Sequence, residues 1–162
     1  MILAPCRVLI VDDSASARQA LARIVEGDPT LEVMAVAGDP YAAAEKMRRE
    51  MPDVILLDVE LPRMDGLTFL RKLMAQRPVP VVICSGHAAA GSEIAMQALE
   101  AGAVEVIEKP RMDVARGLEE ASQRIRQCIR AAAQARLRGA PARALARRPT
   151  APARVASTMV EP

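Results

Sequence analysis

Five polar side chains of this sequence stand at or just after the end of a short apolar run. They are the carboxylates of Asp12, Asp13 and Asp58, the hydroxyl of Ser85 and the amine of Lys109. If the runs are parallel strands, their carboxyl ends meet at one edge of a sheet, which is where α/β proteins bind ligands. Clustered carboxylates beside a lysine indicate a site for a divalent cation and a phosphoryl group.

The chemistry of such a site follows from its charges. Neighbouring carboxylates raise one another's pKa values, and a divalent cation relieves that repulsion. Mg²⁺, or Mn²⁺ in its place, keeps several waters, so Asp13 and Asp58 are candidate direct ligands and Asp12 a ligand through water. The Asp58 carboxylate could attack phosphorus in line and form an acyl phosphate. Lys109 would then neutralise the phosphoryl oxygens and Ser85 would hydrogen-bond them, which gives one surface two chemical states.

An alternation of strand and helix, repeated five times, must position these groups. Strands are predicted over residues 7–11, 31–37, 54–57, 81–84 and 104–107, and helices are predicted to begin near residues 14, 40, 65, 92 and 113. The strands are almost continuously apolar, as in sheets covered by helices on both faces. About 135 residues are too few for a closed eight-stranded barrel. The predicted fold is therefore α/β, a doubly wound, flavodoxin-like parallel sheet with strand order 2-1-3-4-5.

Composition divides the chain into a domain and a tail. Residues 1–132 carry 16 Lys/Arg and 19 Asp/Glu, whereas residues 133–162 carry six Arg and one Glu among alanines and prolines. We expect one domain over residues 1–137 and a linker or disordered tail over residues 138–162. Aromatic residues make up 1% of the chain, so little is available for base stacking, and nucleic acid is not expected as a partner.

The sequence carries no signal for a membrane or an oxidising compartment. No apolar run approaches the roughly 20 residues that span a bilayer. A strand begins almost at the first residue, which leaves no room for a signal peptide. The three cysteines, Cys6, Cys84 and Cys128, have no zinc-ligand spacing. We therefore expect a cytoplasmic protein with reduced thiols and no membrane partner.

Several side chains outside the candidate site have structural interpretations. Ser14, Asp39 and Asp65 are predicted helix N-caps, and Gly66 is a predicted turn glycine. Because aromatic residues are so few, the core is predicted to be aliphatic, with Phe69 inside it. Methionines fill gaps in such cores, and five are placed there: Met34, Met47, Met64, Met74 and Met96.

Taken in order, the pieces of the candidate site resemble the response-regulator receiver family. They are Asp12-Asp13-Ser14 after the first strand, Asp58 after the third, the segment 61–66 beyond it, Ser85 after the fourth and Lys109-Pro110 after the fifth. The resemblance covers residues 6–135 and implies that Asp58 accepts a phosphoryl group from a histidine kinase. It also implies that Asp13, Asp58 and the backbone carbonyl of Glu60 bind Mg²⁺. One departure is Val106, where receivers usually carry Tyr or Phe.

A finer resemblance is to the receiver half of chemotaxis protein-glutamate methylesterases. It is carried by segments 28–33, 61–70, 78–82 and 98–104. It implies a parent protein in which the linker leads to a C-terminal hydrolase domain that acts on chemoreceptors and is blocked in cis by the unphosphorylated receiver. No G-x-S-x-G-like nucleophile turn occurs in this chain. The nucleophile of an output domain is thus absent here, and the chain alone has only phospho-acceptor and autodephosphorylation chemistry.

Three alternatives stay open at this point. The chain could be a stand-alone receiver that acts through a surface around its fourth helix, fifth strand and fifth helix. It could also be the receiver of a DNA-binding response regulator, and the reading frame beyond Pro162 would discriminate these cases from the methylesterase. A haloacid-dehalogenase-like phosphatase also uses an aspartate nucleophile with Mg²⁺. That class needs a D-x-D motif directly after the first strand, where this chain has Asp12-Asp13.

Overall fold

In the computed structural model, which describes residues 4–60, 65–86, 92–110 and 117–137, five parallel strands form one sheet. The strands are β1 (Cys6–Val11), β2 (Leu31–Ala37), β3 (Val54–Leu57), β4 (Val81–Ser85) and β5 (Glu105–Glu108). Their order, β2-β1-β3-β4-β5, and their parallel pairing confirm the predicted doubly wound fold. Compared with the prediction, β4 ends one residue later and β5 is shifted by one residue.

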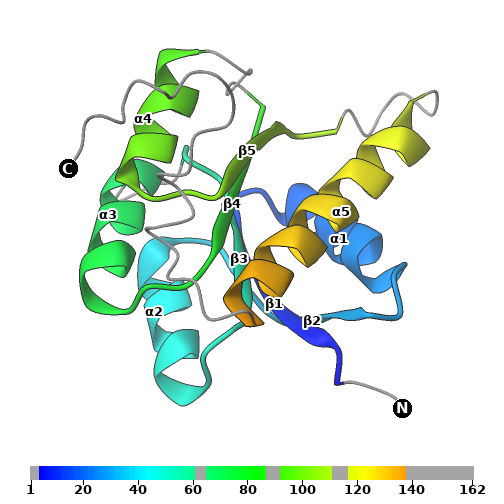
Figure 1. Ribbon diagram of the computed structural model, residues 1–162, viewed down its shortest axis with the longest axis horizontal. Coiled ribbons are helices and arrows are strands. Elements are labelled where there is room, and N and C mark those ends of the chain that lie inside the picture. The colour runs from blue at the N-terminus through cyan, green and yellow to red at the C-terminus, as the bar shows by residue number, and fades with distance from the viewer. Residues whose placement is uncertain (1–3, 61–64, 87–91, 111–116, 138–162) are drawn as a thin grey trace.

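Helices cover both faces of this sheet (Figure 1). They are α1 (Ala15–Glu26), α2 (Pro40–Arg49), α3 (Gly66–Gln76), α4 (Glu93–Ala101) and α5 (Leu118–Leu137). One face is covered by α1 and α5 and the other by α2, α3 and α4, and each layer shares a separate apolar core with the sheet. Among the described residues, none of the helices combines the length and the apolar character that crossing a bilayer requires.

Successive residues of a strand enter different cores. In β1, Leu9 and Val11 belong to the core shared with α2, α3 and α4, whereas Val8 and Ile10 belong to the core shared with α1 and α5. All four side chains are fully buried. Because successive side chains of a strand point to opposite faces, a strand covered on both faces has no polar position. The first polar residue of such a strand therefore falls at the edge of the sheet.

The helix starts agree with the predicted caps. The side chains of Ser14, Asp39 and Asp65 each accept a hydrogen bond from the backbone amide three residues further on. These bonds satisfy amides that have no partner within the first helical turn. The predicted start of the last helix near residue 113 lies outside the described residues, and so does the tail over residues 138–162. The described part of the last helix, α5, begins at Leu118.

The core is aliphatic as predicted, with one exception among the methionines. The confirmed members, buried or packed against the core, are Phe69, Met34, Met47 and Met74. The prediction for Met96 is wrong, because 53% of its side chain is exposed. The buried residues of α4 are Ala95 and Ala98, so position 96 leaves the apolar stripe of that helix. Met64 lies outside the described residues, and the three cysteines are free thiols.

Asp28, which is 8% exposed, joins the end of α1 to α5. Its Oδ1 accepts hydrogen bonds from the backbone amide of Thr30 (2.8 Å) and from the Thr30 hydroxyl (2.6 Å), and its Oδ2 forms an ion pair with Arg130. The Thr30 hydroxyl, together with the Thr30 amide and Arg130, outweighs the opposing effect of burial and holds the pKa of Asp28 below its usual value. The carboxylate is thus favoured in the folded state.

We expect the Asp28→Asn variant to unfold with a free energy about 1–2 kcal/mol lower at pH 7, because an amide cannot replace the charged partner of Arg130. A carboxyl group with a lowered folded-state pKa stabilises the fold above its unfolded-state pKa and loses that contribution as pH falls through the folded-state value. In urea unfolding, the free energies of variant and wild type should therefore differ by this amount at pH 7 and by less at about pH 2.5. The control is Glu26→Gln, which neutralises an exposed carboxylate at the end of α1, two residues before Asp28. A constant difference at both pH values would contradict this role of Asp28.

Candidate functional site

Backbone hydrogen bonds of the sheet continue one residue past three of its strands and hold the candidate site residues. The amide of Asp12 donates to the last carbonyl of β2 at 3.0 Å. In the same way, the amide of Asp58 donates to the last carbonyl of β1 at 2.9 Å, and the amide of Lys109 to the last carbonyl of β4 at 3.0 Å. The backbone of these residues is therefore as fixed as the sheet itself, and their side chains start from neighbouring strand ends.

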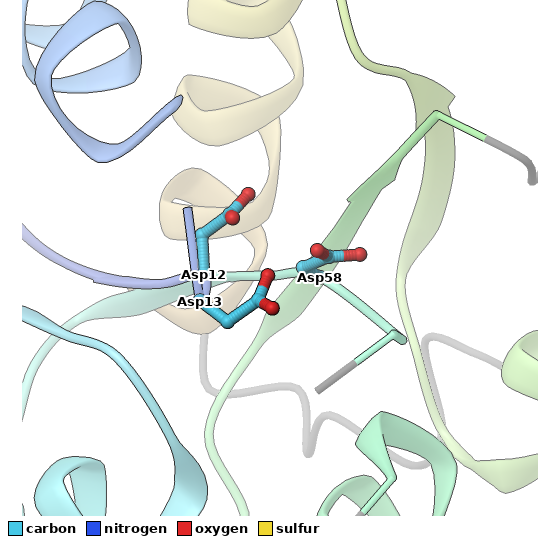
Figure 2. Close-up of side chains that lie close together, drawn as sticks. All are labelled: Asp12, Asp13 and Asp58. Carbon is cyan, nitrogen blue, oxygen red and sulfur yellow. The ribbon is translucent and has the colours of Figure 1, made fainter. Parts of the chain in front are cut away.

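Three carboxylates converge at this edge, as Figure 2 shows. One oxygen from each of Asp12, Asp13 and Asp58 lies within 4.8 Å of the others. Asp12 and Asp58 are buried, at 1% and 4% exposure, whereas Asp13 is exposed and lies on the solvent side of the cluster. Hard carboxylate oxygens this close together, open to water on one side, fit a divalent cation of the Mg²⁺ type.

Local backbone amides orient the two buried carboxylates. The amide of Ser14 donates to Asp12 Oδ1 at 2.9 Å, and the amide of Glu60 donates to Asp58 Oδ1 at 3.1 Å. Each bond spans two residues, which is the local hydrogen bond that Asp favours in turns. One oxygen of each carboxylate is thereby fixed, and the other is left for a cationic partner.

That partner is Lys109. Its Nζ lies 2.7 Å from Asp12 Oδ2 and 3.4 Å from Asp58 Oδ2. Burial lowers the pKa of Lys109, but the ion pairs with Asp12 and Asp58 outweigh burial and raise that pKa above its ordinary value. Burial also raises the pKa of Asp58, with a smaller contribution from Asp12, against the Glu60 amide and Lys109. At neutral pH, Lys109 is therefore a fixed positive charge between two buried carboxylates.

The structure places the remaining predicted site residues, Ser85 and Glu60, at the same edge. Ser85 is the last residue of β4 and is fully buried. Glu60 contributes its amide to Asp58, and the predicted use of its carbonyl for a metal stays a prediction. Val106, in place of the usual aromatic residue, is partly buried against the core shared with α2, α3 and α4.

Two residues that support the site were not recognised as such in the sequence. Arg18 of α1 donates from Nη1 to the backbone carbonyl of Asp12 at 2.8 Å. Gly66 lies against the chain that carries Asp58: a Cβ at this position would be 2.6 Å from the Asp58 carbonyl oxygen and 2.4 Å from the Cα of Val59. The sequence predicted a turn at Gly66. In the structure, the missing side chain lets the start of α3 pack directly against the backbone of Asp58 and Val59. A glycine at the first position of a helix, directly after the N-cap Asp65, was the feature of the sequence that could have indicated this close packing.

We expect Gly66→Ala to lower the free energy of unfolding by about 1–3 kcal/mol, because backbone atoms must move to admit the methyl group. Displacing Asp58 should also slow any chemistry at its carboxylate. Urea unfolding and the rate of phosphoryl incorporation measure the two effects. Gly86→Ala is the matched control, since a Cβ there meets nothing within 4 Å. Equal behaviour of the two variants would show that the contact at Gly66 is not needed.

Comparisons with known proteins agree with this geometry. Residues 8–121 match the response regulator receiver domain family. Over 131 residues the chain is 62% identical to protein-glutamate methylesterase/protein-glutamine glutaminase 5 of Anaeromyxobacter dehalogenans, covering 81% of this chain and 36% of that protein. A relative from Rhodopseudomonas palustris, the protein-glutamate methylesterase/protein-glutamine glutaminase of the group 3 operon, is 57% identical, with 85% and 38% covered. The chain thus spans well under half the length of these relatives.

Solved structures give the same result. The response regulator domain of Thermotoga maritima CheB is 34% identical, with a TM-score of 0.73, and the match covers 80% of this chain and 97% of that one. A chain from the crystal structure of the P1 domain of CheA3 in complex with CheY6 from R. sphaeroides is 36% identical, with a TM-score of 0.66 and coverage of 80% and 100%.

Proposed function

Because the chain belongs to the response-regulator receiver family, we propose that Asp58 is its phosphoryl acceptor and that the carboxylate cluster is its metal site. One observation carries the proposal: at the carboxyl edge of the sheet, Lys109 Nζ lies 2.7 Å from Oδ2 of the buried Asp12 and 3.4 Å from Oδ2 of the buried Asp58. Asp58 directly follows the central strand β3, so it has Asp12 after β1 on one side and Lys109 after β5 on the other.

The metal ligands that we propose are Asp13 and Asp58 directly, Asp12 through a water molecule, and the backbone carbonyl of Glu60. The oxygens of the three aspartates are close enough to share one cation. Oxygen-only donors with an exposed member suit Mg²⁺ or Mn²⁺ rather than zinc. When bound, the cation would offset the negative charge that gathers around phosphorus as the phosphoryl group is transferred.

Each of the other site residues has a proposed role in phosphoryl transfer. A carboxylate oxygen of Asp58 forms the bond to phosphorus while the bond from phosphorus to the donor breaks, with the donor atom keeping the electron pair. Lys109, already next to Asp58 Oδ2, offsets charge on the phosphoryl oxygens. The Ser85 hydroxyl is the proposed hydrogen-bond donor to the new phosphoryl group. Arg18 and the Glu60 amide hold the two buried aspartates in place.

The proposed phosphoryl donor is the phosphohistidine of a chemotaxis-type histidine kinase. The similarity to a chain from a complex that contains the P1 domain of CheA3 supports this choice. The similarity to protein-glutamate methylesterases supports a longer parent protein in which this receiver controls a hydrolase domain in cis and, through it, the modification of chemoreceptors. The reading frame beyond Pro162 should then encode a serine nucleophile turn, and a DNA-binding domain there would contradict the methylesterase parent.

Acetyl phosphate and intact-mass measurement test the core of the proposal. With Mg²⁺ present, the 162-residue chain should gain one phosphoryl group, and EDTA should prevent the gain because Asp58 would then lack the neighbouring cation. Hydroxylamine should remove the group, since acyl phosphates react with it. If the mass does not change with Mg²⁺, or changes equally in EDTA, the proposed phosphorylation site is wrong.

A further inference from the structure

Helices α2 and α3 enclose a groove on the face of the molecule that they share. Its volume is about 320 Å³, and its lining residues extend from Pro40 to Arg48 along α2 and from Phe69 to Arg77 at the end of α3. The groove therefore follows each helix for more than two turns. Figure 1 shows these two helices next to each other over the same face of the sheet.

The floor of this α2–α3 groove is apolar and its rim is basic. Met47, Phe69 and Leu73 form the floor and belong to the core of that face. The charged lining residues are Arg48, Lys72 and Arg77, and no acidic side chain lines the groove within the described residues. An apolar floor with cationic edges is complementary to a ligand that has an apolar centre and acidic flanks.

The basic rim departs from the charge of the surrounding domain. Helices α2 and α3 together with Arg77 contain six Lys/Arg and one acid, Glu45, whereas residues 1–132 as a whole have more acids than bases. Glu45 forms an ion pair with Arg48. Neither Lys72 nor Arg77 forms an ion pair with any described residue, and both are exposed. A partner's carboxylates could therefore reach them without displacing an existing pair.

We propose that the α2–α3 groove docks an acidic amphipathic helix of a partner protein. Such a helix would place an apolar side chain over Met47, Phe69 and Leu73 and its carboxylates beside Lys72 and Arg77, the helix-in-groove mode of recognition. The chain's own segment 138–162 does not suit the site, because its charged residues are five Arg and one Glu and would be repelled by the rim. The inference goes beyond the proposed function, since the groove shares no residue with the carboxylate cluster.

The test uses the ¹⁵N-labelled full chain and three synthetic helical peptides of about 15 residues, the length at which isolated helices begin to form. The first has a Leu/Phe stripe flanked by Glu, the second has Lys in place of every Glu, and the third has Ser in place of the stripe. The first should bind and shift the amide signals of Ala44, Lys72 and Leu73. The second and third should not bind, and sodium chloride should weaken the first, because exposed charges are screened.

Charge reversal provides matched variants. Lys72→Glu combined with Arg77→Glu should weaken the first peptide by about tenfold or more, since two exposed charge pairs are lost and replaced by repulsion. Arg49→Glu combined with Arg71→Glu also reverses two exposed charges of helices α2 and α3, but outside the groove, and should leave binding unchanged. Urea unfolding should be the same for all variants, because the substituted side chains are exposed.

Four outcomes would overturn the proposal. They are no shift with the acidic peptide, equal binding of the basic peptide, shifts that map elsewhere, and equal weakening by Arg49→Glu combined with Arg71→Glu. Two other occupants are tested in parallel with the same variants. If phosphatidylcholine/phosphatidylglycerol vesicles bind through Lys72 and Arg77 while the peptide does not, the groove region contacts membranes instead. If analytical ultracentrifugation shows a dimer that the double substitution dissociates, the occupant is a second copy of the chain.

Discussion

Asp58→Asn should reduce phosphoryl incorporation from acetyl phosphate to the level of a mock-treated sample. Asparagine keeps the size of the side chain and an oxygen that can accept the hydrogen bond from the Glu60 amide. The amide group is not a nucleophile towards phosphorus, however, so the bond-forming step is lost while the fold remains. Intact-mass measurement over a time course with Mg²⁺ gives the extent of labelling.

The matched control is Asp39→Asn, because Asp39 also follows a strand at this edge of the sheet but acts as the N-cap of α2. Asparagine is as good an N-cap as aspartate, so this variant should be labelled like wild type. Labelling of Asp58→Asn at the wild-type rate would move the acceptor to another residue of the cluster, with Asp13 as the exposed candidate. Loss of labelling in both variants would show a general effect of the substitutions and not the chemistry of one carboxylate.

Lys109→Met should lower the free energy of unfolding by about 2–3 kcal/mol in EDTA, since it leaves the buried carboxylates of Asp12 and Asp58 without their shared cation. This loss is smaller than the roughly 3–5 kcal/mol usual for a broken buried pair, because 21% of the lysine side chain is exposed and solvent screens its charge. A raised folded-state pKa means that the lysine's contribution is complete below its unfolded-state pKa and is lost as pH rises through the higher folded-state value. The full loss should therefore be seen in urea unfolding at pH 7.

Mg²⁺ gives this prediction a sharper form. A cation bound by the carboxylates would replace part of the missing charge, so millimolar Mg²⁺ should restore more stability to Lys109→Met than to wild type. Lys46→Met is the control, because Lys46 is an exposed lysine of α2 that lies away from the cluster. If Lys109→Met is as stable as that control, or if Mg²⁺ has no larger effect on it, the ion pairs at Lys109 do not matter to the fold.

Much of the site could be predicted because the inner strands β3 and β4 are buried on both faces. Where every strand position must be apolar, a carboxylate such as Asp58 can stand only at the strand end, and parallel strands bring all such ends to one edge. The N-caps were predictable for a related reason, because Ser14, Asp39 and Asp65 bond to amides three residues away and need no tertiary partner.

Predictions that depended on which face of a helix is buried were less successful. Met96 was predicted to be in the core, but α4 turns the small residues Ala95 and Ala98 towards the core instead. The sequence does not show that these alanines are buried in preference to the methionine. The support that Gly66 and Arg18 give to the site was missed because both contact backbone atoms of the loops that follow β3 and β1. Backbone atoms are the same for every residue type, so such contacts leave no chemical pattern in the sequence.

The sequence by itself therefore determined the strand order, the family and the acid that is proposed to receive the phosphoryl group. The strand order followed from the usual doubly wound pattern, the family from a resemblance in its motifs, and the acid from its place at a strand end. Only the tertiary structure decided that Lys109 contacts both Asp12 and Asp58, that Gly66 presses on the Asp58 carbonyl, and that α2 and α3 share a basic groove. The Lys109 pairs and the groove join residues far apart in the chain, the Gly66 contact joins nearer ones, and the distances in all three follow from how whole helices and strands pack.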